Sequence, residues 1–139
     1  MHHFGFEPLG LPVEDVARIT AEVKIRDNGW PGCPYHLIVG DDERLALCQD
    51  YRTASYHVSG HNHEAIGCAI EGDYTHKEVR QRLSEIVGLA YLEACQAKRN
   101  ACGKAGIRYE ALIPAGHLEL SPTLCPGAGG MLVVRQLRA

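Results

Sequence analysis

The chain has 139 residues, of which 45% are hydrophobic and 22% charged, and this globular balance argues against intrinsic disorder. Such a length suits one core, so we expect residues 1–139 to form a single domain. The formal net charge is −3 and the basic residues are scattered, which argues against nucleic acid as a partner.

The first half of the chain begins with a helical pattern. Apolar residues recur at helical spacing after Pro12, with Glu14 and Asp15 in the first turn, where the helix dipole favours acidic groups, so we expect a helix over 12–26. A turn cluster over 28–34 then leads into a short apolar run at 36–39, which predicts a buried strand. A turn at 41–44 separates it from 45–47, which indicates a hairpin.

The second half alternates in the same way. The run 65–70 predicts an interior strand. Thr75 and Glu78 have the spacing of a capping box, and the apolar stripe that follows predicts the longest helix, over 75–98. We expect a further strand at 109–113 and a terminal helix at 131–138. Alternating strands and helices predict an α/β fold, with one mixed central sheet flanked by helices.

Compartment signals are few. No stretch approaches the roughly 18 apolar residues of a membrane span, and residues 1–5 lack the basic and apolar regions of a signal peptide. We therefore expect no membrane span and, for the sequence as written, a cytoplasmic product. The chain holds six cysteines but is too large to need disulfides, so we expect most of them to be reduced.

One segment has a metal-site pattern. His117 and Cys125 lie eight residues apart in a loop-rich stretch between Gly116 and Gly127. Zinc accepts imidazole and thiolate together, and a site with three protein ligands keeps a position for the water used in hydrolysis. The third ligand is not evident from this segment.

Three segments, in this order along the chain, resemble the motifs of a known family. The first, Gly32 to Val39, contains Tyr-His. The second, His57 to Gly67, contains His-x4-Asn-x3-Ile-Gly, and the third, Gly116 to Gly127, contains His-x7-Cys-Pro-Gly. The chain resembles the type 2 N-acetylmuramoyl-L-alanine amidases and peptidoglycan recognition proteins, which include zinc amidases of the phage-lysozyme type. The similarity extends over nearly the whole chain.

The resemblance implies roles for seven residues and a Zn²⁺ cofactor. The implied zinc ligands are His2, His117 and Cys125. The implied catalytic residues are Tyr35 and Thr123, and His57 and Asn62 match positions that line the peptidoglycan cleft. The implied reaction is hydrolysis of the amide bond between N-acetylmuramic acid and L-alanine, with peptidoglycan or muropeptides as partner, in an endolysin or wall-turnover enzyme of bacterial or phage origin that acts on the cell wall.

The start of the chain departs from the family pattern. Family members carry a whole strand before the His-His pair, whereas only Met1 precedes His2 here, so we expect the usual first strand to be missing and its neighbour's edge to be unpaired. His3 is a weaker alternative for the first ligand. His36 is held in reserve, although a histidine on an apolar strand is more often a hydrogen-bonded core residue.

Two other functions fit the residues. The first is a peptidoglycan-binding protein of the same fold that does not cut its ligand; retention of Cys125 argues against it, and loss of the first strand argues for it. The second is a structural zinc site, which predicts four protein ligands.

Overall fold

A mixed sheet of four short strands forms the centre of the fold. The structure, a computed structural model, describes all of residues 1–139. The strands lie in the order β1–β4–β2–β3, with β1, β4 and β2 parallel and β3 antiparallel to β2. Their bounds are His2–His3 for β1, Leu37–Val39 for β2, Leu45–Leu47 for β3 and Cys68–Ile70 for β4.

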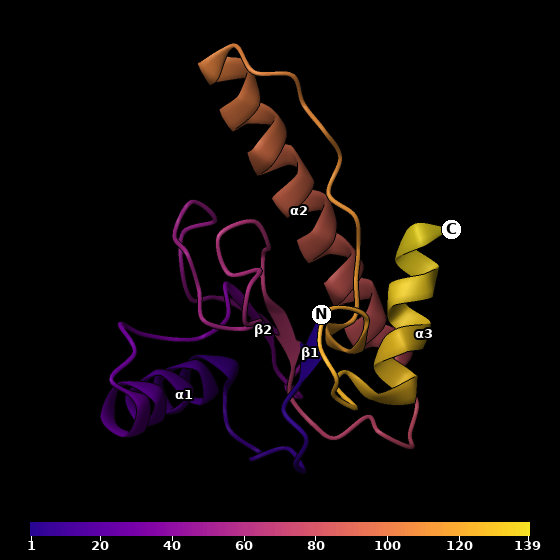
Figure 1. Cartoon of the computed structure of the whole chain (residues 1–139). Coiled ribbons are helices and arrows are strands. Elements are labelled where there is room, and N and C mark those ends of the chain that lie inside the picture. Colours follow the sequence, from indigo (N-terminus) through magenta and orange to yellow (C-terminus); the bar gives the residue numbers. More distant parts are fainter.

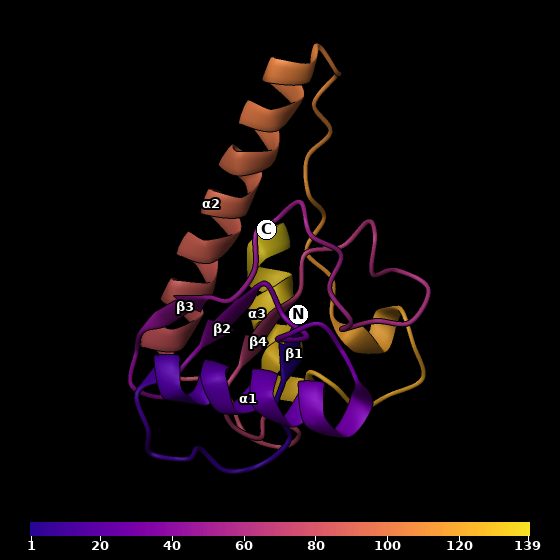
Figure 2. The ribbon, with the colours of Figure 1, turned by 90° about the vertical axis from the view of Figure 1, so that its left-hand side faces the viewer.

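Helices cover both faces of this sheet. Helix α1 (Val13–Asn28) packs on one face, while α2 (Gln81–Ala105) and α3 (Gly127–Arg138) pack on the other (Figures 1 and 2). The predicted α/β class with a mixed, helix-flanked sheet is therefore confirmed. None of the helices is both long and apolar enough to cross a membrane.

Alternation along the strands sorts side chains between two clusters of buried residues. Ile38 packs with Val13 and Val16 of α1, whereas its neighbour Val39 packs with Leu83 and other residues of α2. Successive side chains of a strand point to opposite faces, so one short apolar strand serves both layers. This explains why 37–39 reads as a continuous apolar run.

The first strand is present as a two-residue strand, which corrects the expectation of an unpaired edge. His2 lies beside Ala69 and His3 beside Ile70 in a parallel ladder. The Phe4 amide then donates to the Ile70 carbonyl at 3.2 Å, and the His117 amide donates to the Met1 carbonyl at 3.1 Å. Backbone pairing thus orders this part of the chain.

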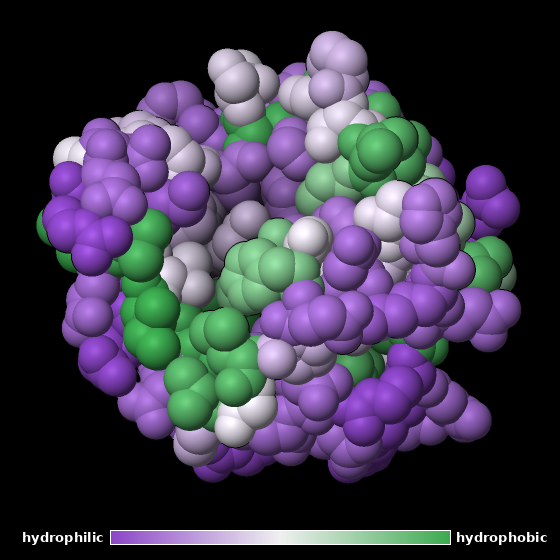
Figure 3. Space-filling model, turned by 90° about the horizontal axis from the view of Figure 1, so that it is seen from below, coloured by the Kyte–Doolittle hydropathy of each residue, from purple (hydrophilic) through white to green (hydrophobic).

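The segment between β1 and α1 is held by a buried carboxylate. The Glu71 oxygens accept hydrogen bonds from the Leu9 amide at 2.7 Å and the Asp41 amide at 3.0 Å. The same segment exposes apolar side chains, including Phe6 at 47% and Leu9 at 46%. The face seen from below shows hydrophobic side chains gathered within a largely hydrophilic surface (Figure 3).

The long helix begins later than predicted, and the capping box is wrong. Helix α2 starts at Gln81, and the Thr75 hydroxyl donates instead to Asp73 at 2.6 Å. The Thr75 and Tyr74 carbonyls accept hydrogen bonds from the amides of Ala128 and Gly129, at the start of α3. This tertiary contact keeps the backbone at 74–75 out of the helix, which continues to Ala105 rather than 98.

The predicted strand at 109–113 is also wrong. Residues 107–116 run back along α2 without joining the sheet (Figure 1). The Tyr91 hydroxyl of α2 donates to the Leu112 carbonyl at 2.9 Å, and Arg99 lies over the Tyr109 ring at 5.0 Å. An apolar run predicts burial, but it does not specify whether the partner is a strand or a helix.

The terminal helix starts four residues earlier than predicted, at Gly127. Glycine disfavours helix, yet any side chain at Gly129 would overlap the Lys77 carbonyl. Close packing of α3 against residues 74–78 therefore explains glycines inside the first turn of this helix.

Candidate metal centre

Three segments distant in sequence bring together two imidazoles and a thiol. His2 comes from β1, His117 opens the short 3-10 helix η1 (His117–Glu119), and Cys125 lies just before α3. One potential ligand atom from each lies within 4.8 Å of the other two. His2 is buried, whereas His117 and Cys125 are half-buried. The structure thus brings together the three residues for which a ligand role was predicted.

Backbone hydrogen bonds fix the loop that carries His117 and Cys125. The Leu118 amide donates to the Cys125 carbonyl at 2.7 Å, and the His3 amide points at Cys125 Sγ at 3.4 Å. Thr123 Oγ1 accepts from the Cys125 amide at 3.2 Å. These contacts close the loop on itself and tie it to β1.

A charged clamp from α3 holds η1. The Arg138 guanidinium donates to both Glu119 oxygens, at 3.0 and 2.7 Å, and to the Pro114 carbonyl at 2.7 Å. Glu119 in turn accepts from the Gly116 amide at 2.8 Å. Sequence reasoning missed this clamp because its two halves are 19 residues apart and neither belongs to a motif.

The environment keeps the histidines neutral. Burial lowers the pKa of His2 to about 2, helped by the N-terminal ammonium group and by the neighbouring histidines. Burial also lowers the pKa of His117, and it raises the pKa of the Cys125 thiol. Both imidazoles therefore offer lone pairs at neutral pH, while Cys125 holds a proton that a metal would displace.

This donor set fits zinc. Two neutral imidazoles and one thiolate match the ligand types that Zn²⁺ takes in proteins, and a set of three leaves a fourth tetrahedral position open. Magnesium and calcium prefer oxygen ligands, which this cluster lacks. The residues are consistent with a zinc site of the kind found in zinc amidases.

Tyr35 lies against the cluster. Its ring centroid is 5.2 Å from that of His2. The Tyr35 ring also stacks on the Phe4 ring, with centroids 5.9 Å apart. Burial raises the pKa of Tyr35, so the phenol is protonated at neutral pH and can donate a hydrogen bond.

The two residues predicted to line a cleft form internal hydrogen bonds. Asn62 Oδ1 accepts from the amides of His57 and Val58, at 3.0 and 2.9 Å. His57 lies edge-on to His2, with ring centroids 5.2 Å apart, and burial lowers its pKa to about 4.

The two alternative ligands are engaged elsewhere. His3 Nδ1 accepts from the Tyr74 amide at 2.9 Å, on the other face of β1. The buried His36 uses both ring nitrogens: Nδ1 accepts from the Gly67 amide at 3.0 Å, and Nε2 lies 2.8 Å from the Thr53 carbonyl. His36 is thus a hydrogen-bonded core histidine, and neither residue belongs to the cluster.

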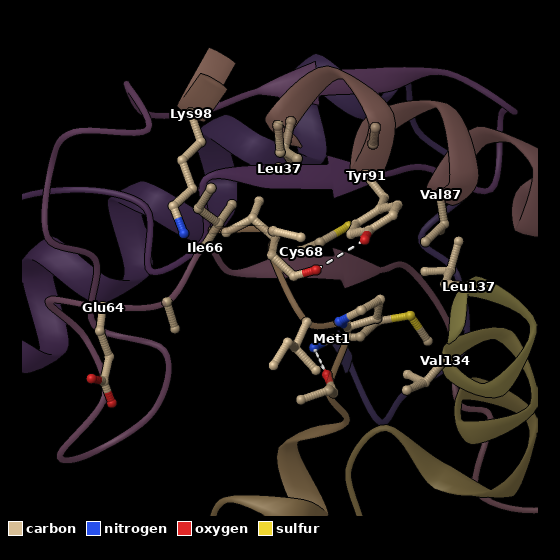
Figure 4. A pocket seen from close by; sticks show the side chains of 18 of the residues that line it. Met1, Leu37, Glu64, Ile66, Cys68, Val87, Tyr91, Lys98, Val134 and Leu137 are labelled. Carbon is tan, nitrogen blue, oxygen red and sulfur yellow. Dashed lines mark hydrogen bonds between the residues drawn. The ribbon is translucent and has the colours of Figure 1, made fainter. Parts of the chain in front are cut away.

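A separate apolar pocket of about 590 Å³ lies between α2 and the returning segment 107–116. Met1, Cys68 and Tyr91 line it, but the three donors of the cluster do not (Figure 4). The cluster of His2, His117 and Cys125 therefore does not line this pocket.

Known proteins share this sequence pattern and fold. The chain is 26% identical over 132 residues to an N-acetylmuramoyl-L-alanine amidase of Sus scrofa, a match covering 90% of the chain and 21% of that protein. It is 24% identical over 101 residues to the endolysin of Escherichia phage T7, covering 73% of the chain and 63% of the endolysin. The chain thus spans about a fifth of the amidase and under two thirds of the endolysin. No family model matches the chain.

Among solved structures, the fold matches an ectodomain complex of the peptidoglycan recognition proteins LCa and LCx bound to tracheal cytotoxin. The TM-score is 0.75 at 23% identity, with 92% of this chain and 74% of that chain covered. Fold and cluster together define an α/β domain with three side-chain donors placed so that they could hold a metal ion. The chain is therefore similar in sequence to an N-acetylmuramoyl-L-alanine amidase and a phage endolysin, and similar in fold to peptidoglycan recognition proteins.

Proposed function

We propose that this protein is a zinc-dependent N-acetylmuramoyl-L-alanine amidase that hydrolyses peptidoglycan or muropeptides. The observation that carries the proposal is the convergence of His2, His117 and Cys125, whose donor atoms lie within 4.8 Å of one another. A three-ligand set of this type is the arrangement that zinc hydrolases use. We propose further that it acts on the bacterial cell wall.

Zinc, when bound by these residues, supplies Lewis acidity and lowers the pKa of water. Tyr35 then has the position and protonation state to donate a hydrogen bond to the oxygen of the scissile carbonyl, on which negative charge develops. Thr123 Oγ1 already accepts from the Cys125 amide, so its own proton is available for the substrate. Hydrolysis breaks the amide C–N bond, and water supplies hydroxyl to the lactyl carbonyl and a proton to the L-alanine amine.

A binding protein of the same fold is the second candidate. The similarity to a recognition-protein complex bound to tracheal cytotoxin favours it. Such a protein needs the fold and a cleft but no open metal position. A purely structural zinc site is less well supported, because the cluster has three donors rather than four.

The deciding experiment combines zinc content with product release. Atomic emission should give one zinc per chain, and purified peptidoglycan should release peptides with a free L-alanine amine. Cys125→Ala should lose both zinc and release, while Cys102→Ala, at a half-buried cysteine outside the cluster, should keep both. Tyr35→Phe should keep zinc and slow release by about 10²-fold, the loss typical of one removed oxyanion donor.

Three results would count against the proposal. One zinc without release from the wild-type protein would favour the binding protein. Undiminished release by Cys125→Ala would exclude the site. Zinc retained in Cys125→Ala would exclude its ligand set.

A further inference from the structure

The His57 ring, beside the cluster, is held in one orientation. It lies in the loop between β3 and β4, where Asn62 Oδ1 accepts hydrogen bonds from its backbone amide and from that of Val58. The ring packs on Gly67, where a Cβ atom would lie 2.7 Å from His57 Cγ and Cδ2. Glycine at this position therefore makes room for the imidazole, and Asn62 fixes the backbone that carries it.

The hydrogen bonds of His57 specify where its proton lies. Its Nε2 is 3.2 Å from the Ala65 carbonyl, which can only accept, so Nε2 carries the hydrogen. In a neutral imidazole the other nitrogen, Nδ1, is then unprotonated. This atom faces His2 Nε2 at 3.1 Å.

The same logic continues to His2. Because His57 Nδ1 accepts, His2 Nε2 must donate, and the lone pair of His2 lies on Nδ1. That atom points at Cys125 Sγ, 3.7 Å away. A chain of two hydrogen bonds, from His2 to His57 to Ala65, thus turns the unprotonated nitrogen of His2 toward the other donors of the cluster.

We infer that His57 is a positioning residue, whose Nδ1 accepts the Nε2–H of His2 and so holds His2 in the tautomer and orientation needed to bind zinc through Nδ1. This inference rests on the proposed zinc site. It gives His57 a role different from the substrate contact implied by the resemblance. Partners that orient a ligating histidine are typically worth 10- to 100-fold in metal affinity.

A pair of nearly isosteric substitutions tests this role. Asn at position 57 offers an Oδ1 where His57 has Nδ1, whereas Leu offers no acceptor. In competition with a chromogenic chelator, His57→Leu should bind zinc about 10- to 100-fold more weakly than wild type, while His57→Asn should stay within about threefold. His63→Leu, at an exposed neighbour, should leave the affinity unchanged.

The tautomer itself is measurable without metal. In ¹⁵N-labelled metal-free protein, long-range ¹H–¹⁵N spectra should show His2 protonated at Nε2 and unprotonated at Nδ1. This measurement needs no variant, so it tests the inference even if His57→Leu does not fold.

The outcomes separate the inference from the function on which it rests. Unchanged zinc affinity in His57→Leu, equal losses in His57→Leu and His57→Asn, or a His2 protonated at Nδ1 would each overturn the role of His57. A wild-type chain that binds no zinc would instead overturn the proposed function.

Discussion

His2 and His3 are adjacent in β1, yet their side chains lie on opposite faces of the sheet. The His2 ring faces His117, with centroids 4.6 Å apart, whereas His3 Nδ1 accepts from the Tyr74 amide at 2.9 Å. The period of two along a strand makes such neighbours inequivalent. Only one member of the His-His pair can therefore contribute to the cluster.

This arrangement predicts unequal effects of two alanine substitutions. His2→Ala removes one of three donors and should weaken zinc binding by more than about 100-fold, beyond the loss expected for an orienting partner. His3→Ala removes a contact to the Tyr74 backbone and should change zinc affinity by less than about tenfold. Isothermal titration with zinc checks both, and equal effects would contradict the assignment of His2.

Zinc affinity should depend on pH through Cys125. Burial raises the pKa of this thiol, while the pKa of His2 is far below neutral, so between pH 6 and 7 the cysteine is the donor that must lose a proton on binding. Release of one proton makes the apparent affinity rise about tenfold per pH unit. Chelator competition at several pH values measures the slope, and a flat profile would show that the thiol does not ligate.

The clamp between Arg138 and Glu119 should hold His117 in position to bind zinc. Arg138→Met removes three hydrogen bonds that hold η1 and residue 114, so we expect a several-fold loss of zinc affinity. Arg135→Met, on the exposed side of the same helix, is the matched control. If both variants behave alike, the clamp does not position His117.

The buried histidines should make the metal-free protein less stable in acid. The pKa of His2 is about 2 in the folded protein but about 6.5 when unfolded. Below pH 6.5 the unfolded chain therefore binds a proton that the folded one does not, and stability falls as pH falls. Urea unfolding measures the free energy of unfolding at pH 6.5 and at pH 5. The decrease between the two pH values should be smaller in His2→Gln than in wild type, by about 1.5 kcal/mol. Parallel profiles would contradict a neutral, buried His2.

Local signals in the sequence account for the elements that were predicted well. Helix α1 follows Pro12 and ends at Asn28, capped by Gly29 with a φ of 64°, and the apolar run of β2 is buried on both faces. The start of α2 could not be predicted, because the Tyr74 and Thr75 carbonyls are bonded by a helix more than 50 residues later.

The site divides in the same way. His117 and Cys125 are close in sequence and gave a metal pattern by themselves. The third donor, His2, is separated from them in sequence by all the other strands of the sheet. Only the family resemblance therefore pointed to it. The contact of His57 with His2 depends on the pairing of β1 with β4, and no local pattern encodes it.

Glycines at the start of α3 provide a final prediction about the scaffold beneath the site. A Cβ atom at Gly129 would overlap the Lys77 carbonyl, whereas one at Gly103, in α2, would meet nothing within 4 Å. Gly129→Ala should therefore destabilise the protein by about 3 kcal/mol through forced backbone movement. Gly103→Ala should stabilise it by about 0.5–1 kcal/mol, because alanine loses less conformational entropy in a helix. The two substitutions should shift the urea midpoint in opposite directions. If Gly129→Ala leaves the midpoint unchanged, α3 does not pack this closely on residues 74–78. The position of Cys125, just before α3, would then need another support.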